Sequence, residues 1–205
     1  MNYINFLRTL FLVRFSPMYL ANATRVLKID PREDKIEYIG PSFEGKQKWY
    51  GGIVGCDGCL YGIPQNYHGV LKINPRDQSC TILMSDNIPE GDWKWHGGLA
   101  IQDGRFIMGF PNNAASVLMI DVLEQKVFTI HSPCLHSGQH RIPQDDRYKY
   151  LGGAVTKDGR FTYLFPCDAE RVLRMDNNTL DLTLIGPLLL EGENKFQNGF
   201  LGRDG

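Results

Sequence analysis

Long apolar runs and an excess of either charge are both missing from this chain of 205 residues. No stretch approaches the roughly 18 apolar residues that a membrane-spanning helix needs, so we expect no membrane span. Lys and Arg number 22 against 23 Asp and Glu. Because this balance creates no strong electrostatic field, the sequence argues against nucleic acid as a partner.

The chain also lacks a full set of cysteine pairs, because its cysteines are odd in number. The five are Cys56, Cys59, Cys80, Cys134 and Cys167. A disulfide framework pairs its cysteines, so we predict free thiols in a reducing compartment and a cytoplasmic location. Residues 1–24 contain Arg8 and Arg14 and no acidic residue. The apolar run 10–13 is too short for a secretory core, which leaves secretion and mitochondrial import as the less favoured alternatives.

The short motifs of several large enzyme classes do not occur either. The sequence has no serine nucleophile elbow, P-loop or dinucleotide-binding fingerprint. Apolar residues do not recur at the spacing of amphipathic helices, which excludes solenoids built from helices. Glycine is abundant instead, with 22 residues beside 11 prolines. This composition predicts many turns and short extended segments.

One motif occurs four times along the chain. Its copies begin 46, 55 and 46 residues apart, at Lys48-Trp-Tyr-Gly-Gly, Lys94-Trp-His-Gly-Gly, Lys149-Tyr-Leu-Gly-Gly and Lys195-Phe-Gln-Asn-Gly. An Asp-Gly pair follows each start, and three copies continue to Pro64, Pro111 or Pro166. The closing element is Val70-Leu-Lys-Ile-Asn, Val117-Leu-Met-Ile-Asp and Val172-Leu-Arg-Met-Asp, with a further copy at Val26-Leu-Lys-Ile-Asp.

Each copy contains the signals of four short antiparallel strands. In the first full copy we predict strands over residues 51–54, 60–63, 70–73 and 79–84. Asp57-Gly58 predicts a type I′ hairpin turn between the first two strands. Pro64 ends the second strand because proline cannot donate to the hydrogen-bond ladder. Four strands in a unit of 46–55 residues are typical of the blade of a β-propeller.

We therefore predict an all-β propeller with four-stranded blades and about four repeats. Arg14-Phe15 and Asp204-Gly205 are complementary halves of one blade, so three blades are complete and one is split between the two ends. The chain is either a closed four-bladed ring or part of a propeller with six to eight blades, in which case self-assembly is possible. The predicted boundaries are a non-repeat segment 1–13, repeats 14–47, 48–93, 94–148 and 149–194, and a further start at 195–205.

The pattern of Gly-Gly, Asp-Gly, Pro and Val-Leu-x-Ile-Asp over residues 14–205 resembles the blades of NHL, YVTN and quinoprotein-like propellers. Kelch blades are a more distant match, because the Gly-Gly here follows a Trp in the first two copies. The resemblance implies the fold and leaves the function open, since these families include enzymes and binding modules. The chain matches no complete metal-binding set of the gluconolactonase type and no quinone-docking signature, so the resemblance implies no cofactor and no catalytic residue.

Two groups of residues are candidates for ligand binding on one face of the propeller. The first recurs at the start of the inner strand of each blade, where a ring of ammonium groups could hold an anionic ligand. It comprises Lys48, Trp49, Lys94, Trp95, Lys149, Tyr150 and Lys195. The competing interpretation is that these residues pack one blade on the next. The second group lies in the loops between the second and third strands: Asn66, His68, Asn112, Asn113, Asp168 and Arg171.

A long insertion over residues 131–148 contains the residues that could bind a metal ion, namely His131, Cys134, His136 and His140. Their spacing could coordinate zinc or copper, but no second cluster completes the site, so an exposed polar loop is the favoured interpretation. We expect a non-catalytic binding or scaffold module for a protein or a small anionic ligand. The alternative is a hydrolase or lactonase with a metal at the channel mouth.

Overall fold

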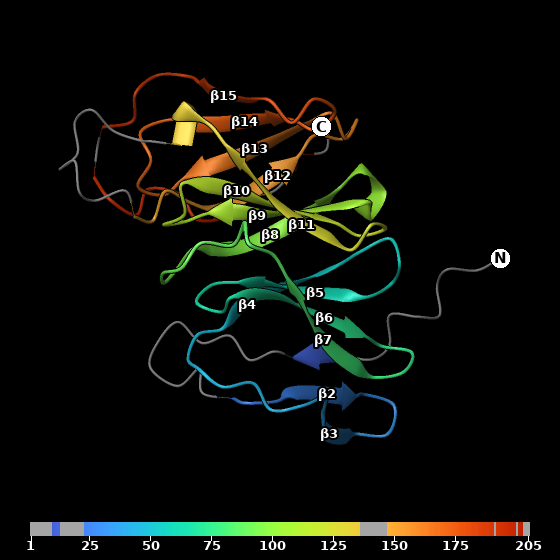
Figure 1. Ribbon diagram of the computed structural model, residues 1–205. Helices are drawn as coiled ribbons and strands as arrows, with labels where there is room; N and C mark the ends of the chain where they lie inside the picture. The colour runs from blue at the N-terminus through green and yellow to red at the C-terminus, as the bar shows by residue number, and fades with distance from the viewer. Residues whose placement is uncertain (1–9, 13–22, 136–146, 191, 200, 203–205) are drawn as a thin grey trace.

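The computed structural model describes residues 10–12, 23–135, 147–190, 192–199 and 201–202. Its strands form four antiparallel sheets that succeed one another along an arc (Figure 1). Three sheets have four strands and the first sheet has three. In every sheet the strands follow one another in the order of the sequence, which is the predicted connectivity of propeller blades.

The strand boundaries agree with the predicted repeat. The first sheet contains β1 (Leu10–Leu12), β2 (Val26–Asp30) and β3 (Lys35–Ile39). The second contains β4 (Trp49–Val54), β5 (Leu60–Pro64), β6 (Gly69–Asn74) and β7 (Ser79–Met84). The third contains β8 (Trp95–Ile101), β9 (Phe106–Pro111), β10 (Ser116–Asp121) and β11 (Lys126–His131). The fourth contains β12 (Tyr150–Val155), β13 (Phe161–Pro166), β14 (Val172–Asp176) and β15 (Leu182–Ile185).

Short 3₁₀ turns are the only helices among the described residues, at Gln102–Gly104 and Pro133–Leu135. No helix there is long and apolar enough to cross a membrane. All five cysteines are free thiols. Cys56 and Cys59 flank the first hairpin turn.

The hydrophobic core lies between neighbouring sheets. One cluster joins the second and third sheets and includes Ile63 and Leu118, and another joins the third and fourth sheets and includes Met108 and Leu173. Strand β10 is buried along its whole length, because the third sheet has a neighbour on each face. This explains why β10 reads as a continuous apolar run rather than as an alternating pattern. Each such buried side chain contributes about 1.5–3 kcal/mol.

The hairpin after β4 differs from the predicted type I′ turn. Gly58 has a φ of 77°, but Asp57 is not among the residues with positive φ. The Gly58 N–H donates to Gly55 O (2.9 Å), and the Gly55 N–H donates to Cys59 O (2.9 Å). This is a three-residue loop with glycine in the left-handed position. Asp57 selects it because its Oδ1 accepts the Cys59 N–H (3.0 Å), which holds the backbone in a local turn.

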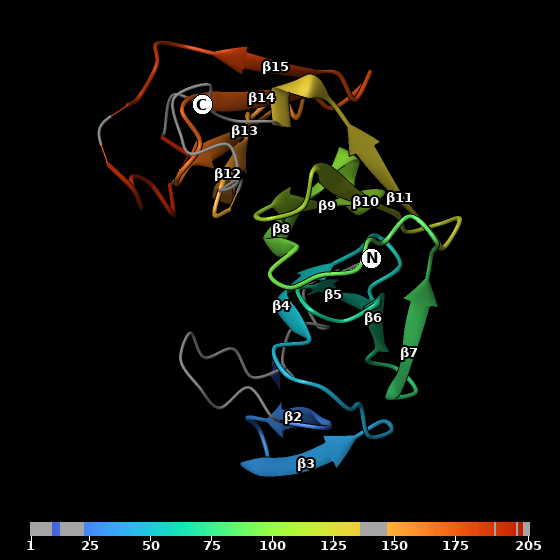
Figure 2. The same cartoon turned by 60° about the vertical axis from the view of Figure 1, so that its left-hand side comes forward.

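The first sheet includes one strand from the predicted non-repeat segment 1–13. Strand β1 pairs with β2, so the first sheet begins at Leu10 and not at residue 14. The halves of the split blade, 14–15 and 204–205, lie outside the described residues. In both views the first and fourth sheets lie at opposite ends of the arc (Figures 1 and 2). The sheets formed by the described residues therefore make an open arc.

Candidate functional site

The asparagine and aspartate residues of the loops between second and third strands connect each blade to the next. Asn66 Oδ1 accepts the backbone N–H of Trp93 (2.9 Å), and Asn113 Oδ1 accepts that of Tyr148 (3.2 Å). The third bond runs from the Asn194 N–H to Asp168 Oδ1 (2.6 Å). We call these three acceptors the Asx clamp. Their side chains face a neighbouring blade and not an open ligand face.

The residues that donate to the clamp share an unusual backbone conformation. Trp93, Tyr148 and Asn194 have φ values of 56°, 53° and 55°, in the left-handed region. Each immediately precedes a motif lysine, and Gln47 before Lys48 has a φ of 48°. A left-handed residue with a side chain is uncommon and needs a local stabilising contact. The clamp bond supplies that contact and turns the chain into each inner strand.

Three of the four motif lysines lie inside the protein, whereas Lys195 is half-buried and its Nζ donates to Gly192 O (3.4 Å). Lys48, Lys94 and Lys149 are 6%, 3% and 0% exposed. Lys48 Nζ donates to Gly45 O (2.7 Å), and Lys94 Nζ donates to Gly91 O (2.9 Å). Burial lowers the pKa of both lysines, against the opposing effect of Glu44 on Lys48 and of Asp92 on Lys94. The ammonium groups bond the chain three residues upstream, which supports the packing interpretation over a ring at the channel mouth.

The aromatic residues beside these lysines are buried in the core. Trp49 Nε1 donates to Gly69 O (2.8 Å) and Trp95 Nε1 donates to Ser116 O (2.7 Å). The Tyr150 hydroxyl donates to Arg171 O (3.1 Å). Each ring therefore bonds a carbonyl at the start of the third strand of its own blade.

The remaining loop candidates do not converge on one site. His68 is exposed and stacks on Tyr67, with ring centroids 4.1 Å apart. Asn112 is fully buried, and neither polar atom of its side-chain amide has a hydrogen-bond partner. Arg171 is half-buried, and its carbonyl is occupied by Tyr150.

The predicted metal ligands are only partly described. His131 ends β11 and its Nε2 lies 3.2 Å from Thr129 Oγ1. Cys134 Sγ donates to Leu182 O (3.6 Å). His136 and His140 lie outside the described residues. In the described part of the chain no three His, Cys, Asp or Glu side chains are grouped so that they could hold a metal ion.

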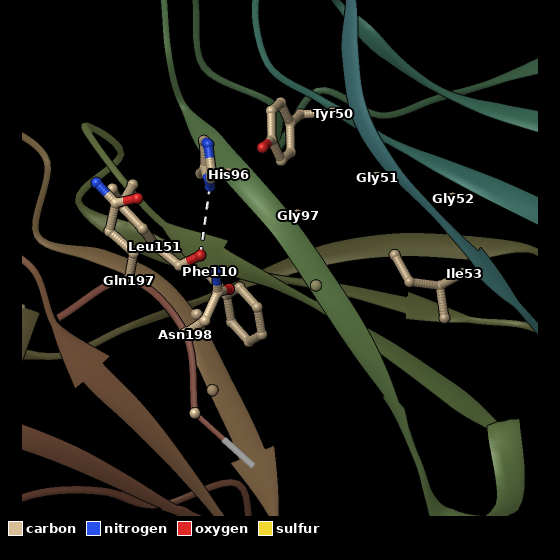
Figure 3. Close-up of a pocket in the computed structure, with 14 residues that line it drawn as sticks. Tyr50, Gly51, Gly52, Ile53, His96, Gly97, Phe110, Leu151, Gln197 and Asn198 are labelled. Carbon is tan, nitrogen blue, oxygen red and sulfur yellow. Dashed lines mark hydrogen bonds between the residues drawn. The ribbon is translucent and has the colours of Figure 1, made fainter. Parts of the chain in front are cut away.

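A cavity of about 330 Å³ lies on the side of the arc where the inner strands β4, β8 and β12 run next to one another. Figure 3 shows it between these strands and the segment 197–199. We call this surface the inner wall. It is lined by Tyr50, His96, Leu151 and Gln197, by the glycines that follow them, and by Ile53, Phe110 and Asn198.

A repeated bulge places the side chains of the inner wall. The pairing register between first and second strands shifts at Tyr50/Gly52, at Trp95/Gly98 and at Tyr150/Gly152. Bulges bend a strand and redirect side chains, and they are frequent beside functional sites. In the first two copies glycine accommodates the bend, since Gly51 and Gly97 have φ values of 76° and 69°.

An aromatic pair dominates one side of the cavity. The rings of Tyr50 and His96 stack with centroids 3.8 Å apart and planes inclined by 28°. His96 Nδ1 lies 3.3 Å from Leu151 O, as the dashed line in Figure 3 shows. Burial lowers the pKa of His96, although this contact opposes the shift. Burial thus favours the neutral imidazole, and no Asp, Glu, Lys or Arg is present among the described residues that line the cavity.

Sequence reasoning passed over the residues of the inner wall, although a signal was present. Within the constant frame of lysine, aromatic residue and two small residues, the third position changes from Tyr50 to His96, Leu151 and Gln197. The Asx clamp was also visible, because Asn66, Asn113 and Asp168 each lie four residues before the valine of the third strand.

Solved structures with a similar fold are propellers of diverse function. Virginiamycin B lyase from Staphylococcus aureus is 13% identical, with a TM-score of 0.60 over 80% of this chain and 48% of its own. The periplasmic gluconolactonase of Pseudomonas aeruginosa is 16% identical, with a TM-score of 0.53 over 91% of this chain and 57% of its own. The chain has a β-propeller fold. Hydrazine synthase of Kuenenia stuttgartiensis is 14% identical, with a TM-score of 0.54 over 79% of this chain and 43% of its own.

These similarities show the fold alone, because all three identities lie far below the level at which function is shared. The chain spans about half the length of the lyase. No protein-family model and no curated protein matches the sequence.

Proposed function

We propose that this propeller is a non-catalytic binding module that takes a small, planar, uncharged molecule on its inner wall. One observation carries the proposal: a cavity of about 330 Å³ is lined by a stacked aromatic pair and by glycine-rich strands, with no formally charged side chain. Ligand sites for small molecules begin at about this size and combine apolar surface with a few polar groups.

The chemistry of the lining indicates the class of ligand. The faces of Tyr50 and His96 offer stacking surface to a flat ring system. Phe110 and Ile53 add apolar contacts, whereas Gln197 and Asn198 supply amide donors and acceptors. The space beside Gly52 is open to a ligand, because a Cβ at this position would meet no atom within 4 Å. A flat ring with an amide-like edge would use all three kinds of surface.

An anionic ligand held by the motif lysines is disfavoured by their burial. Lys94 and Lys149 are 3% and 0% exposed, so neither ammonium group is presented to solvent at the channel mouth. The loop face is also less suited to a partner protein than the sequence suggested, because three of its six candidates form the Asx clamp. Five free thiols support the cytoplasm as the proposed location.

The competing function is a hydrolase or lactonase with a metal at the channel mouth. This alternative is considered because a lyase and a gluconolactonase are among the structures with a similar fold. Among the described residues of the inner wall, Tyr50 and His96 are the titratable groups, whereas a calcium or zinc site needs several ligands. Metal analysis of the purified chain separates the two functions. Stoichiometric calcium or zinc would contradict the binding-module proposal.

Benzamide and benzoate form a matched pair of probes, since they share a ring and differ in charge. We expect benzamide to bind with a Kd on the order of 1 mM and benzoate at least several-fold more weakly. Two-dimensional NMR should show benzamide shifting the ring signals of Tyr50 and His96. Equal binding of the two probes, or no binding of either, would overturn the proposal.

Gly52→Val tests the location of the site. Its Cβ has free space within 4 Å and its φ is ordinary for a side chain, so the valine fills the cavity without straining β4. We expect the variant to keep its melting temperature and to lose benzamide binding. Met84→Val on the outer strand β7 is the control and should bind as the unmodified chain does. Retained binding in Gly52→Val would place the site elsewhere.

A further inference from the structure

The His96 ring directs one of its nitrogens at a group that can only accept a hydrogen bond. His96 Nδ1 lies 3.3 Å from Leu151 O, the contact drawn as a dashed line in Figure 3. A backbone carbonyl oxygen carries lone pairs and no hydrogen, so Nδ1 must carry the proton and donate. A neutral imidazole has one protonated nitrogen, and the bond made by one nitrogen fixes the state of the other. Nε2 is therefore unprotonated and presents a lone pair.

Two neighbouring blades hold the ring in this orientation. Tyr50 on β4 stacks on the ring, and Leu151 on β12 supplies the carbonyl. Both residues occupy the motif position that His96 occupies in its own copy. A half-turn of the ring about the Cβ–Cγ bond would keep the stack, but it would place a carbon against Leu151 O and lose the hydrogen bond. The packing of three blades thus selects one tautomer.

The lone pair of Nε2 has no hydrogen-bond partner among the described residues. His96 is half-buried, and Nε2 does not belong to the polar atoms that are buried without a partner. The atom is therefore accessible, and His96 lines the cavity of the inner wall. A few placed polar groups of this kind orient a small ligand in a mostly apolar pocket.

We propose that His96 Nε2 accepts a hydrogen bond from the inner-wall ligand, so that the ligand is a planar molecule with an N–H donor at its ring edge. The narrower ligand class, which rests on the proposed function, comprises primary and secondary amides, lactams and amino-substituted rings. Uncharged rings whose polar groups only accept, such as esters and ketones, lack the donor. The amides of Gln197 and Asn198 do not make this selection, because an amide side chain can donate or accept.

The tautomer can be measured in the unmodified chain without a ligand. In a ¹⁵N-labelled sample at about pH 7.5, two-bond couplings from the ring protons distinguish a protonated nitrogen from an unprotonated one. We expect His96 Nδ1 to be protonated and Nε2 to be unprotonated. The chain has five histidines, and the spectrum of His96→Phe identifies the His96 signals by their absence. A protonated Nε2 would overturn the inference, whichever probes bind.

Benzamide and methyl benzoate test the donor directly, since both are uncharged aromatic carbonyl compounds and only benzamide has N–H groups. We expect methyl benzoate to bind about 3- to 10-fold more weakly in NMR titrations, because one hydrogen bond is lost. His96→Phe keeps an aromatic ring beside Tyr50 and removes Nε2. It should lower the affinity for benzamide to that for methyl benzoate and leave the latter unchanged.

His68→Phe is the matched control. His68 is exposed, stacks on Tyr67 and is not part of the cavity lining, so this variant should bind both probes as the unmodified chain does. Equal affinities for benzamide and methyl benzoate at the inner wall would overturn the inference and leave the binding-module proposal standing. Absence of binding by both probes would overturn both proposals. A difference between the probes that persists in His96→Phe would assign the selection to another residue and overturn the inference.

Discussion

The Asx clamp and the inner wall both recur from blade to blade, but they differ in how far their residues vary. At the clamp the residue type, the left-handed donor and the bond to the next blade recur in each described copy. On the inner wall the backbone bulge recurs, but the side chain that it presents changes from tyrosine to histidine, leucine and glutamine.

This difference separates structural from functional residues. A contact that holds blade on blade must satisfy the same geometry at every joint, so its residues are constrained to be alike. A binding surface has no such requirement, and different side chains around one cavity create a particular ligand shape. Variation inside a constant frame is therefore the better guide to the site of a repeat protein.

The largest effect should come from a core aromatic residue compared with its neighbour on the inner wall. Trp95→Ala removes a fully buried ring and its bond to Ser116, and we expect it to lower the free energy of unfolding by about 3–5 kcal/mol. His96→Ala removes a stacked ring and should cost only about 0.5–1.5 kcal/mol. Urea unfolding measures both. Equal losses of unfolding free energy would contradict the distinction between the core residue and the inner-wall residue.

Two glycines at the same motif position should respond differently. A Cβ at Gly98 would lie 2.0 Å from Met108 O, whereas a Cβ at Gly52 would meet nothing within 4 Å. We expect Gly98→Ala to cost about 1–3 kcal/mol or more because the strands must separate. Gly52→Ala should change stability by less than about 0.5 kcal/mol. Thermal unfolding of the two variants provides the comparison, and a stable Gly98→Ala would refute the close approach.

The clamp can be tested by removing one acceptor. Asn113→Ala removes the acceptor of the Tyr148 backbone N–H, and we expect a loss of about 0.5–1.5 kcal/mol. Asn113→Asp keeps an acceptor, as Asp168 does in the next copy, and should recover most of that loss. Benzamide binding should be the same in both variants. A stable Asn113→Ala would show that the clamp bond is dispensable.

The motif lysines allow a direct choice between packing and ligand binding. Lys94→Ala should lower the unfolding free energy by about 1 kcal/mol, because the buried aliphatic stem is lost. Lys94→Met keeps a stem of similar length without a buried ammonium and should restore stability. Neither variant should change the affinity for benzamide or benzoate. Weaker benzoate binding without loss of stability would instead support the lysine ring.

The smallest effect concerns the pH dependence of stability. Burial lowers the pKa of His96, so the unfolded chain binds a proton at this residue more readily than the folded protein. His96 therefore destabilises the fold as the pH falls through 6.5 toward the lower folded pKa, and stability is complete above that window. His96→Gln should flatten this dependence in urea unfolding between pH 7.5 and 5. If the unfolding free energy of His96→Gln depended on pH as that of the unmodified chain does, burial of His96 would be contradicted.

Several features were predictable because they depend on spacing alone. The recurrence of Gly-Gly, Asp-Gly and Pro predicted the strands of the second to fourth sheets, and the propeller fold followed from their regular repetition. The turn at Asp57-Gly58 was correctly located, but its type was not, because the aspartate bonds its own backbone. The start of the first sheet at Leu10 falls outside the repeat and had no signal.

The amino-acid sequence alone determines the blade, since period-2 patterning, glycine turns and proline strand ends are local properties of the chain. It could not determine which polar residues face solvent. Lys94 looks like a surface residue in one dimension, but the fold buries it in three. The inner wall likewise exists only after three separate strands converge, because a cavity is a property of packed elements and no single segment contains it.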